Sequence, residues 1–583
     1  MSRTPVVRAE APYDQEAAVT RDSRARPWRG LTLALPAVVI LIGGWRHRWT
    51  YEDAFINFRI VDQILAGHGP VFNAGERIEA FTSPLWLAAL VVVKVTLGAA
   101  LSIQWAALVT ALAMATAGFA LGARTTRTLH PDGDWVLPIG LLSVAAVPIV
   151  WDFATSGLET GLVWFWLAGC WSVLVTAGQR RAAPEGRRRL VSLLVLGLGP
   201  VVRPDLGLMS VCFLVAWLYI VRPPLRQMAA DVLIALSISI LYQVFRMGYY
   251  ASLVPSTALA KDAGGIHVHQ GINYALDLSR PYALWIPLLL IVGLLSRTAV
   301  RSSPPLRVAV VAMSGAGVLH AAYIVMVGGD YMHGRLLLPA LFAFSLPAAV
   351  GWSATHKTRE AAFAGAVIAV GAVWAVVCAG WLRYQNPPLV TLPQISSSRE
   401  ASPLVEPREN DNKFWTGAQI AKAYARGERG TVKLVGDKVL RTGDPHKLVV
   451  VVGSIGIAGY NAGVNVRVVD IGGLAEPLAA RTDPIGGRPA GHRKQVDQAW
   501  YTAQFGVPVQ TRFFGVTVVH ADPAKVAAAR KALRCAPLSE LLEAIDKPLT
   551  PKRFLSNIVH SFEYTKLRIP RDPVQAEWKF CGR

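Results

Sequence analysis

The chain has 583 residues, of which 53% are hydrophobic and only 17% are charged, and its mean hydropathy is +0.37. A soluble protein would carry about 25% charged residues, so this composition excludes an ordinary soluble domain. The net charge is +21, but much of the excess lies in short loops between apolar runs. Membrane lipid is therefore an expected partner, and nucleic acid is not.

Long apolar runs recur from Leu31 to Leu382. A helix needs roughly 20 residues to cross the hydrocarbon core of a bilayer. The runs therefore predict a polytopic α-helical membrane protein with about eleven transmembrane helices. The predicted spans lie near residues 31–45, 101–122, 135–150, 161–177, 190–202, 206–221, 228–247, 282–297, 306–327, 336–351 and 361–382.

The basic residues indicate which side of the membrane each loop occupies. Residues 1–30 are polar and mixed in charge, which predicts a disordered cytoplasmic tail and not a cleaved signal peptide. If the run 84–98 is a helix that lies at the outer interface, the strongly basic short loops all fall on one side. The positive-inside rule then places the N-terminus inside and the C-terminus outside. Loops 46–100 and 248–281 fall on the outer face.

The last third of the chain is less apolar than the predicted membrane region 31–382. Residues 383–410 are rich in Pro, Ser and Asn, which is typical of a linker. Residues 411–583 contain runs typical of strands, such as Leu448–Val452, and of helices, such as Ala524–Leu533. We therefore expect an extracytoplasmic soluble domain, α/β or β-rich, which could bind a carbohydrate polymer as acceptor.

The acidic pair Glu52-Asp53 directly follows the first apolar run. An acidic pair at a bilayer surface is costly unless it has a partner or a function. Asp53 precedes a predicted helix start at 54–59, whose free N–H groups would stabilise an anion. Such a carboxylate could act as a general base or stabilise positive charge at the anomeric carbon of a sugar. The structural alternative is a helix cap with an exposed acid.

Two further polar sites interrupt the apolar sequence at the predicted outer edge. Glu159 ends the string Ser-Gly-Leu-Glu between two spans, where a carboxylate needs a partner or a polar cavity. The alternative is a surface turn in which Glu159 caps the next helix. Arg203-Pro-Asp205 breaks a second apolar stretch, and its arginine suggests a contact with a phosphate or carboxylate. The alternative there is an ion pair that closes a tight turn.

Two more outer loops carry candidate ligands for a phosphorylated sugar. Lys261 lies in the long loop 248–281 and is a candidate phosphate partner. The string Asp330-Tyr-Met-His-Gly-Arg335 places several polar groups between two spans. Arg335 could hold a phosphate through two N–H groups, and Asp330 and His333 could bind sugar hydroxyls or transfer a proton. The alternative is a turn held by an internal ion pair.

The cysteines and the glycines bear on compartment and cofactor. Cys535 and Cys581 lie in the predicted exported domain and could form a disulfide. No cysteine spacing typical of a metal site is present, so a divalent cation is not indicated and a metal requirement stays open. The run Gly453–Gly459 lacks the GxGxxG spacing of a dinucleotide site, and the sequence indicates no cofactor.

Several strings together resemble one family, the terminal β-(1→2)-arabinofuranosyltransferases of the mycobacterial and corynebacterial cell envelope. The strings are Glu-Asp-Ala-Phe-Ile (52–56), Glu-Ala-Phe-Thr-Ser-Pro-Leu-Trp (79–86), Ala-Thr-Ser-Gly-Leu-Glu-Thr (154–160), Val-Arg-Pro-Asp (202–205), Gly-Asp-Tyr-Met-His-Gly-Arg (329–335), Gly-Ile-Ala-Gly-Tyr-Asn-Ala-Gly (456–463) and Asp-Ile-Gly-Gly-Leu-Ala-Glu-Pro-Leu (470–478). The resemblance extends from about Leu31 to near the C-terminus.

The resemblance implies a glycosyltransferase C fold in the plasma membrane, with the active site outside. It implies decaprenylphosphoryl-arabinofuranose as donor and the arabinan of arabinogalactan or lipoarabinomannan as acceptor. Many members have Asp-Asp where this chain has Glu52-Asp53, so the main catalytic role is expected at Asp53. The cations expected at the donor phosphate are Arg59, Lys261 and Arg335. A β donor that gives a β product means net retention, for which a simple inverting base does not suffice.

Two alternatives stay open from the sequence. One is a related transferase that uses another polyprenyl-phosphate sugar, such as mannose. The other is a transporter of lipid-linked sugars, for which internal repeats and charges near the bilayer midplane would be expected. The sequence has no evident repeat, and its charges lie at the predicted outer edge. We expect a monomer.

Overall fold

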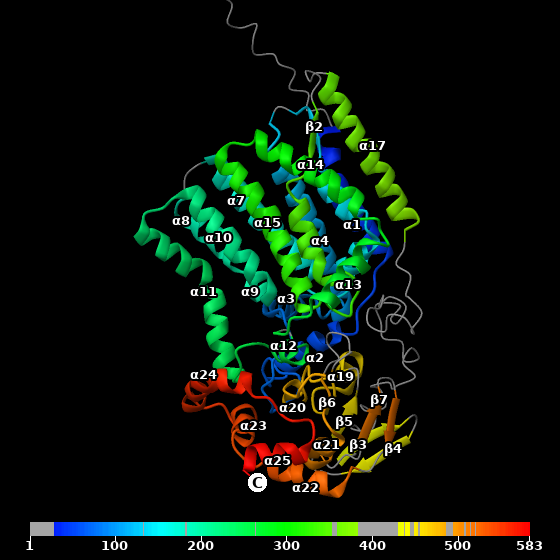
Figure 1. Cartoon of the computed structure of the whole chain (residues 1–583), viewed down its shortest axis with the longest axis vertical. Coiled ribbons are helices and arrows are strands. Elements are labelled where there is room, and N and C mark those ends of the chain that lie inside the picture. The colour runs from blue at the N-terminus through cyan, green and yellow to red at the C-terminus, as the bar shows by residue number, and fades with distance from the viewer. Residues whose placement is uncertain are drawn as a thin grey trace, which may run out of the picture.

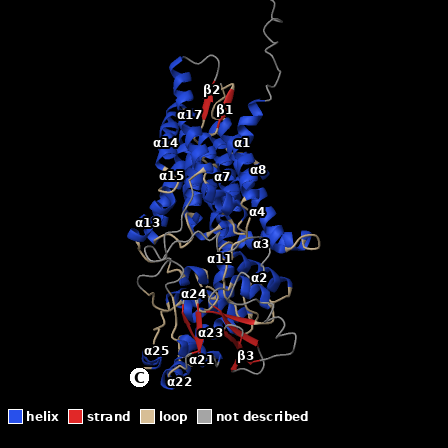
Figure 2. Ribbon diagram, turned by 90° about the vertical axis from the view of Figure 1, so that its right-hand side faces the viewer, coloured by secondary structure: helices blue, strands red, loops and turns tan. Residues whose placement is uncertain are grey.

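The computed structural model describes residues 28–131, 133–180, 184–262, 264–352, 358–382, 430–435, 438–442, 448–452, 455–485, 494–505, 509–512, 515–518 and 521–582. The predicted tail (1–30) falls almost entirely outside these ranges, and the predicted linker (383–410) does so completely. A long helical part occupies one end of the molecule, and a smaller part with most of the strands occupies the other (Figure 1, Figure 2).

The helical part runs from α1 to α17. Its elements are α1 (Trp28–Arg46), α2 (Ala54–Leu65), α3 (Pro84–Leu97), α4 (Ile103–Arg127), β1 (Trp135–Leu137), α5 (Ile139–Ala145), α6 (Pro148–Thr155), α7 (Thr160–Arg180), α8 (Gly186–Gly197), α9 (Gly199–Val202), η2 (Pro204–Leu206), α10 (Gly207–Val221), α11 (Leu225–Tyr250), α12 (Ser256–Ala260), α13 (Val268–Ser279), α14 (Trp285–Arg301), α15 (Pro304–Val327), η3 (Arg335–Leu337), α16 (Leu338–Ser345), β2 (Val350–Trp352) and α17 (Thr358–Gly380). Strands β1 and β2 pair antiparallel.

Six helices in the described ranges are long and apolar enough to cross a membrane. They are α4, α7, the continuous segment Pro204–Val221, α11, α15 and α17. A polytopic helical membrane protein is therefore the class of the fold, and the count of eleven spans stays a prediction.

Prolines account for some of the difference between these helices and the predicted spans. The predicted span 135–150 is divided between α5 and α6, and Pro148 opens α6, because proline suits the first turn of a helix and interrupts a longer one. The run 84–98 forms α3, a helix of 14 residues, which is shorter than a typical span.

The C-terminal part contains a four-stranded sheet and a set of short helices. Its strands are β3 (Gly430–Val435), β4 (Lys438–Thr442), β5 (Leu448–Val452), β6 (Arg467–Asp470), β7 (Val509–Arg512) and β8 (Gly515–Val518). Its helices are α19 (Gly456–Ala462), α20 (Pro477–Ala480), α21 (Gln498–Phe505), α22 (Pro523–Ala532), α23 (Leu538–Asp546), α24 (Pro551–Lys566) and α25 (Pro573–Cys581). The sheet order is β4-β3-β5-β6, and β7 pairs with β8 in a separate hairpin.

Within the sheet, β3 pairs antiparallel with β4 and parallel with β5, and β5 pairs parallel with β6. Cys535 and Cys581 form a disulfide, with their Cα atoms 5.5 Å apart. The bond joins the end of α25 to the segment after α22.

The two parts share a hydrophobic core. Ile455, Ala462 and Val466 of the C-terminal part belong to the same buried cluster as the side chains of the membrane helices. Helix α19 packs on α2, α20 packs on α12, and α24 packs on the end of α11. Helices α19, α20 and α24 of the C-terminal part therefore pack directly on elements at one end of the helical part.

Candidate active site

Asp53 lies at the start of α2, between the two parts of the molecule. It occupies the N-cap position, but its side chain makes no capping hydrogen bond. The carboxylate is partly exposed, and in the described ranges no basic side chain lies within ion-pair distance of it. The free N–H groups of the first turn of α2 stabilise a negative charge at this point. Asp53 is therefore a carboxylate whose oxygens are not committed to the helix.

Two tyrosines, the buried Tyr51 and the partly buried Tyr331, position Asp53. The Tyr331 hydroxyl donates to Asp53 Oδ2 at 3.1 Å, and the Tyr51 hydroxyl donates to the Tyr331 hydroxyl at 2.9 Å. Burial, followed by the charge of Asp53, raises the pKa of both tyrosines well above the usual value. Both hydroxyls therefore stay protonated and act as donors. Neither tyrosine was nominated from the sequence, although Tyr331 stands inside the string 330–335.

Asp330 adds a second carboxylate next to Tyr331. Its Oδ1 accepts a hydrogen bond from the Tyr331 main-chain N–H at 2.9 Å and lies 3.6 Å from Lys261 Nζ. Its Oδ2 is buried, accepts no hydrogen bond from the described part of the chain, and lies 3.9 Å from Arg335 Nη1. Lys261, whose ammonium also lies over the Tyr331 ring, is 27% exposed. Asp330 therefore keeps one oxygen available to a ligand.

Arg335 connects Asp330 to Glu159. Its Nη2 lies 3.2 Å from Glu159 Oε1, and its Nη1 contacts the Met332 sulfur. Its Nε–H is buried without a hydrogen-bond acceptor in the described ranges. Burial alone would raise the pKa of Glu159, but Arg335 and Arg203 together lower it below the usual value. Glu159 is therefore an ionised, buried partner of two arginines, and not a helix cap on the surface.

Arg203 and Asp205 form the ion pair that the sequence left as an alternative. Nε and Nη2 of Arg203 each donate to Asp205 at 2.7 Å, and Nη1 lies 3.5 Å from Glu159. His320, on α15, brings its Nε2 to 2.7 Å from Asp205. Since its donors meet protein carboxylates, Arg203 supports the position of Glu159 behind the cluster. His320 was not predicted because it lies inside an apolar span.

His333 is held on both sides of its ring. Its Nδ1 lies 2.6 Å from Asp277, and its Nε2 lies 3.2 Å from the Tyr282 hydroxyl. The residue is 1% exposed. This geometry fits a residue that fixes the loop 328–334 against α13 better than one that binds a sugar hydroxyl directly.

Glu52 turns away from Asp53 and reaches the C-terminal part. Its Oε1 accepts hydrogen bonds from the main-chain N–H groups of Gly456 and Ile457, at 2.6 and 3.2 Å. The two chains approach so closely that a Cβ on Gly456 would lie 2.0 Å from the Glu52 carbonyl oxygen. Only glycine suits this position. Glu52 therefore joins the two parts through these hydrogen bonds, and a catalytic role for it beside Asp53 stays a prediction.

Arg59 also has partners other than those expected from the sequence. It is 1% exposed, and its guanidinium donates to the main-chain oxygens of Phe72, Gly459, Gly463 and Val466 and to the Asn73 side chain. Burial lowers the pKa of Arg59 to about 9. All five donors of the guanidinium are used, which leaves none for a donor phosphate. No residue pattern predicts these acceptors, because most of them lie about 400 positions away along the chain.

The C-terminal part brings one more acid to this region. Asp470, at the end of β6, accepts hydrogen bonds from the main-chain N–H groups of Gly472 and Ala475, at 2.8 and 2.9 Å. Burial raises the pKa of Asp470 to about 6, and the charge of Asp53 adds to the rise. The turn 470–476 therefore lies within electrostatic reach of Asp53. In the sequence, this turn stands out only because residues 470–478 resemble a string of the arabinofuranosyltransferase family.

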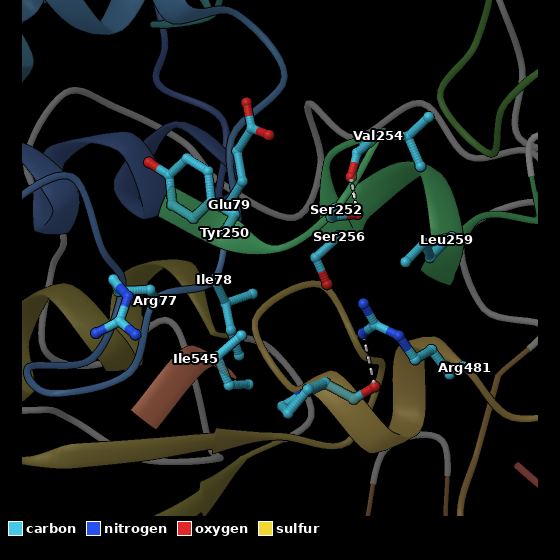
Figure 3. A pocket seen from close by; sticks show the side chains of 11 residues that line it. Arg77, Ile78, Glu79, Tyr250, Ser252, Val254, Ser256, Leu259, Arg481 and Ile545 are labelled. Atoms are coloured by element: carbon cyan, nitrogen blue, oxygen red, sulfur yellow. Dashed lines mark hydrogen bonds between the residues drawn. The ribbon is translucent and has the colours of Figure 1, made fainter. Parts of the chain in front are cut away.

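A small cavity lies at the seam between the two parts (Figure 3). Arg77, Glu79 and Ser256 line it from the outer loops, and Arg481 and Ile545 line it from the C-terminal part. Glu79 forms an ion pair with Arg246 at 2.6 Å. The Asp53 cluster consists of Asp53, Lys261, Asp330, Tyr331 and Arg335. None of these residues lines the cavity, so the cavity belongs to the interface between the two parts. Across the described ranges, no group of three or more His, Cys, Asp or Glu side chains could hold a metal ion.

Comparisons with known proteins identify the family. Residues 430–577 match the AftB family C-terminal domain. The chain is 33% identical to a terminal β-(1→2)-arabinofuranosyltransferase of Mycobacterium tuberculosis, over 95% of this chain and 97% of that protein. It is 31% identical to a protein of the same name from Corynebacterium glutamicum, over 89% of this chain and 82% of that protein. No solved structure matches. The chain belongs to the terminal β-(1→2)-arabinofuranosyltransferase family.

Proposed function

We propose that this membrane protein transfers an arabinofuranose residue from decaprenylphosphoryl-arabinofuranose to a β-(1→2) position at the end of an arabinan chain. The acceptor would be the arabinan of arabinogalactan or lipoarabinomannan. Family membership supports the reaction class. The single observation that carries the site is the Asp53 carboxylate, which is held by Tyr331, has no ion-pair partner in the described ranges, and lies beside the Asp330–Arg335 pair.

The proposed chemistry follows from the charges. As the bond to the donor phosphate breaks, positive charge grows at the anomeric carbon and negative charge grows on the leaving phosphate. Asp53 faces the anomeric carbon and stabilises its positive charge. The Nε–H of Arg335 and the ammonium of Lys261 are the donors proposed for the phosphate. Asp330, through its available Oδ2, is proposed to bind a sugar hydroxyl.

The proposed location of the site is the extracytoplasmic face of the plasma membrane. The ends of α7 and α14 and the starts of α8 and α15 lie at the end of the helical part opposite the C-terminal part (Figure 1). These helix ends carry Arg187, Arg188, Arg301 and Arg307, as the cytoplasmic ends of membrane helices commonly do. The disulfide between Cys535 and Cys581 suits an oxidising compartment. We propose that the C-terminal part, which meets the site through the turn 470–476, binds the acceptor.

The test is the turnover of lipid donor by purified Asp53→Asn protein. We expect a loss of at least about 100-fold in kcat, because an amide cannot stabilise developing positive charge as a carboxylate does. Asp62→Asn is the matched control, since it makes the same change on the same helix outside the cluster, and it should retain activity. The melting temperatures of both variants should stay close to that of the wild type. Near-normal turnover by Asp53→Asn would remove Asp53 from the mechanism.

A further inference from the structure

Helix α24 (Pro551–Lys566) carries an apolar face that no described part of the chain covers. Leu555, Val559 and Phe562 are 63%, 74% and 53% exposed. Their spacing of four and three residues places them on one face of the helix. Asn557 and Ser561, on another face, are 2% and 1% exposed, and the Asn557 side chain donates to carbonyl oxygens of α11 and α23. The helix is therefore held to the protein on one face and shows apolar side chains on a different one.

The position of α24 relates this face to the bilayer. It packs across the end of α11, at the edge of the C-terminal part (Figure 1). The Asn557 side chain donates to the Gly248 carbonyl oxygen at 2.9 Å, and the Phe554 ring lies so close that a Cβ on Gly248 would meet it at 2.3 Å. The contact between the two helices therefore fixes α24 at one level along α11, that of Gly248.

Helix α11 marks the depth of the membrane at this point. Only 11% of its most apolar window is buried inside the protein, and Leu233, Leu241 and Val244 are 64%, 69% and 42% exposed. These side chains must face lipid. From Val244 to Gly248 the helix rises about 6 Å, so α24 lies about one turn beyond the last exposed apolar residue of α11. This is the depth of the boundary between acyl chains and headgroups.

The charges of α24 suit that boundary. The helix carries Lys552, Arg553 and Lys566 against a single acidic residue, Glu563. The Lys566 ammonium lies 4.1 Å from the centre of the Phe562 ring, at the edge of the apolar face. Basic residues beside an apolar face are typical of helices that lie in the interface and contact anionic headgroups.

We propose that α24 is an interfacial helix that inserts Leu555, Val559 and Phe562 into the outer leaflet beside α11 and holds the C-terminal part against anionic membrane lipid. The C-terminal part is then fixed at a constant height above the bilayer by lipid as well as by protein contacts. The proposal does not depend on the reaction that the protein catalyses.

The test measures the depth of single nitroxide labels on the full chain in lipid nanodiscs. Cys170, Cys212 and Cys378, the free cysteines of the described ranges, are first replaced by alanine, and the disulfide is kept. One label replaces Val559, and a control label replaces the exposed Arg530 on α22, which lies at the end of the C-terminal part farthest from the membrane helices (Figure 1). Collision rates with oxygen, which enters lipid, and with a water-soluble nickel chelate give the depth of each label.

We expect the ratio of oxygen to nickel collisions to be several-fold higher at position 559 than at position 530. A label at position 555 should give a collision ratio similar to that at position 559. Agreement between the two labels would show that neither label disturbs the helix locally. Omitting anionic lipid from the nanodiscs should make the label at 559 shallower. Equal nickel access at 559 and 530 would place the face in water, and shielding of 559 from both reagents would place protein there. Either result would overturn the proposal, and an unchanged depth without anionic lipid would remove anionic headgroups from it.

Discussion

The surroundings of two buried arginines differ in a way that separates a structural region from a reactive one. Arg59, where α2 meets the C-terminal part, gives all five of its donors to main-chain oxygens and one side-chain amide. Arg335, at the end of the membrane helices that meets the C-terminal part, is paired with Glu159 and keeps an N–H without an acceptor in the described ranges. Both residues are almost fully buried.

The difference shows what burial alone does not reveal. A buried cation whose donors are all satisfied has no capacity left for a ligand, and its loss leaves unpaired acceptors behind. A buried cation with a free donor, next to a carboxylate oxygen that accepts no hydrogen bond, is costly unless a ligand completes the set. Arg59 is a cation whose donors are all satisfied. Arg335 is a cation with a free donor, and Asp330 beside it supplies the carboxylate oxygen that accepts no hydrogen bond in the described ranges.

The largest effect on stability is expected at Arg59. Arg59→Ala would leave several buried carbonyl oxygens without donors at the junction of the two parts. We expect a loss of about 3 kcal/mol or more in the free energy of unfolding. Thermal unfolding in detergent measures this loss, and Arg530→Ala, at an exposed position on α22, serves as the control. A melting temperature equal to that of the control would mean that Arg59 does not join the two parts.

Asp330→Asn is expected to act on catalysis. The amide keeps the size of the side chain but loses the charge that faces Lys261 and Arg335. We expect turnover of lipid donor to fall about 10- to 100-fold with a small change in melting temperature. If instead the melting temperature falls and the turnover of folded protein is unchanged, Asp330 belongs with Arg59 among the structural residues.

The smallest effect concerns pH. Burial raises the pKa of Glu476 to about 8 from an ordinary value of 4.5, so the folded state holds a proton that the unfolded state has released. Stability is then greatest below pH 4.5 and declines as pH rises toward 8. Glu476→Gln removes the ionisation, so the melting temperature should fall less between pH 5 and 8 than in the wild type. Glu540→Gln, at an exposed position on α23, should leave the slope unchanged, and an unchanged slope in Glu476→Gln would contradict the buried proton.

The sequence predicted which polar residues gather near Asp53 better than it predicted the partners of each residue, and their roles in a site stay predictions. Asp53, Lys261, Asp330 and Arg335 were nominated because polar residues are conspicuous at the ends of apolar spans, and the structure brings them into one cluster. Their order along the chain could not show that Tyr331 would join Asp53, because that contact spans 278 positions. Such long-range pairings depend on the packing of whole helices.

The fold shows the same limit. Hydropathy predicted the apolar segments, but it did not predict where prolines such as Pro148 divide them into shorter helices. The C-terminal part was predicted as a separate soluble domain. Its contacts with the outer loops, including those of Glu52 and Arg59, depend on main-chain N–H and C=O groups, which every sequence contains and no residue type reveals.

The most direct test of the contrast is to make one substitution, arginine to lysine, at both positions and to measure donor kinetics and melting temperature together. Lysine keeps the charge but offers a single ammonium in place of the planar guanidinium. Arg335→Lys should lower kcat/KM for the lipid donor at least about 10-fold with little change in melting temperature, and Arg59→Lys should lower the melting temperature while folded protein keeps its activity. Full donor turnover by Arg335→Lys, together with a lowered melting temperature, would contradict the assignment of Arg335 to the active site.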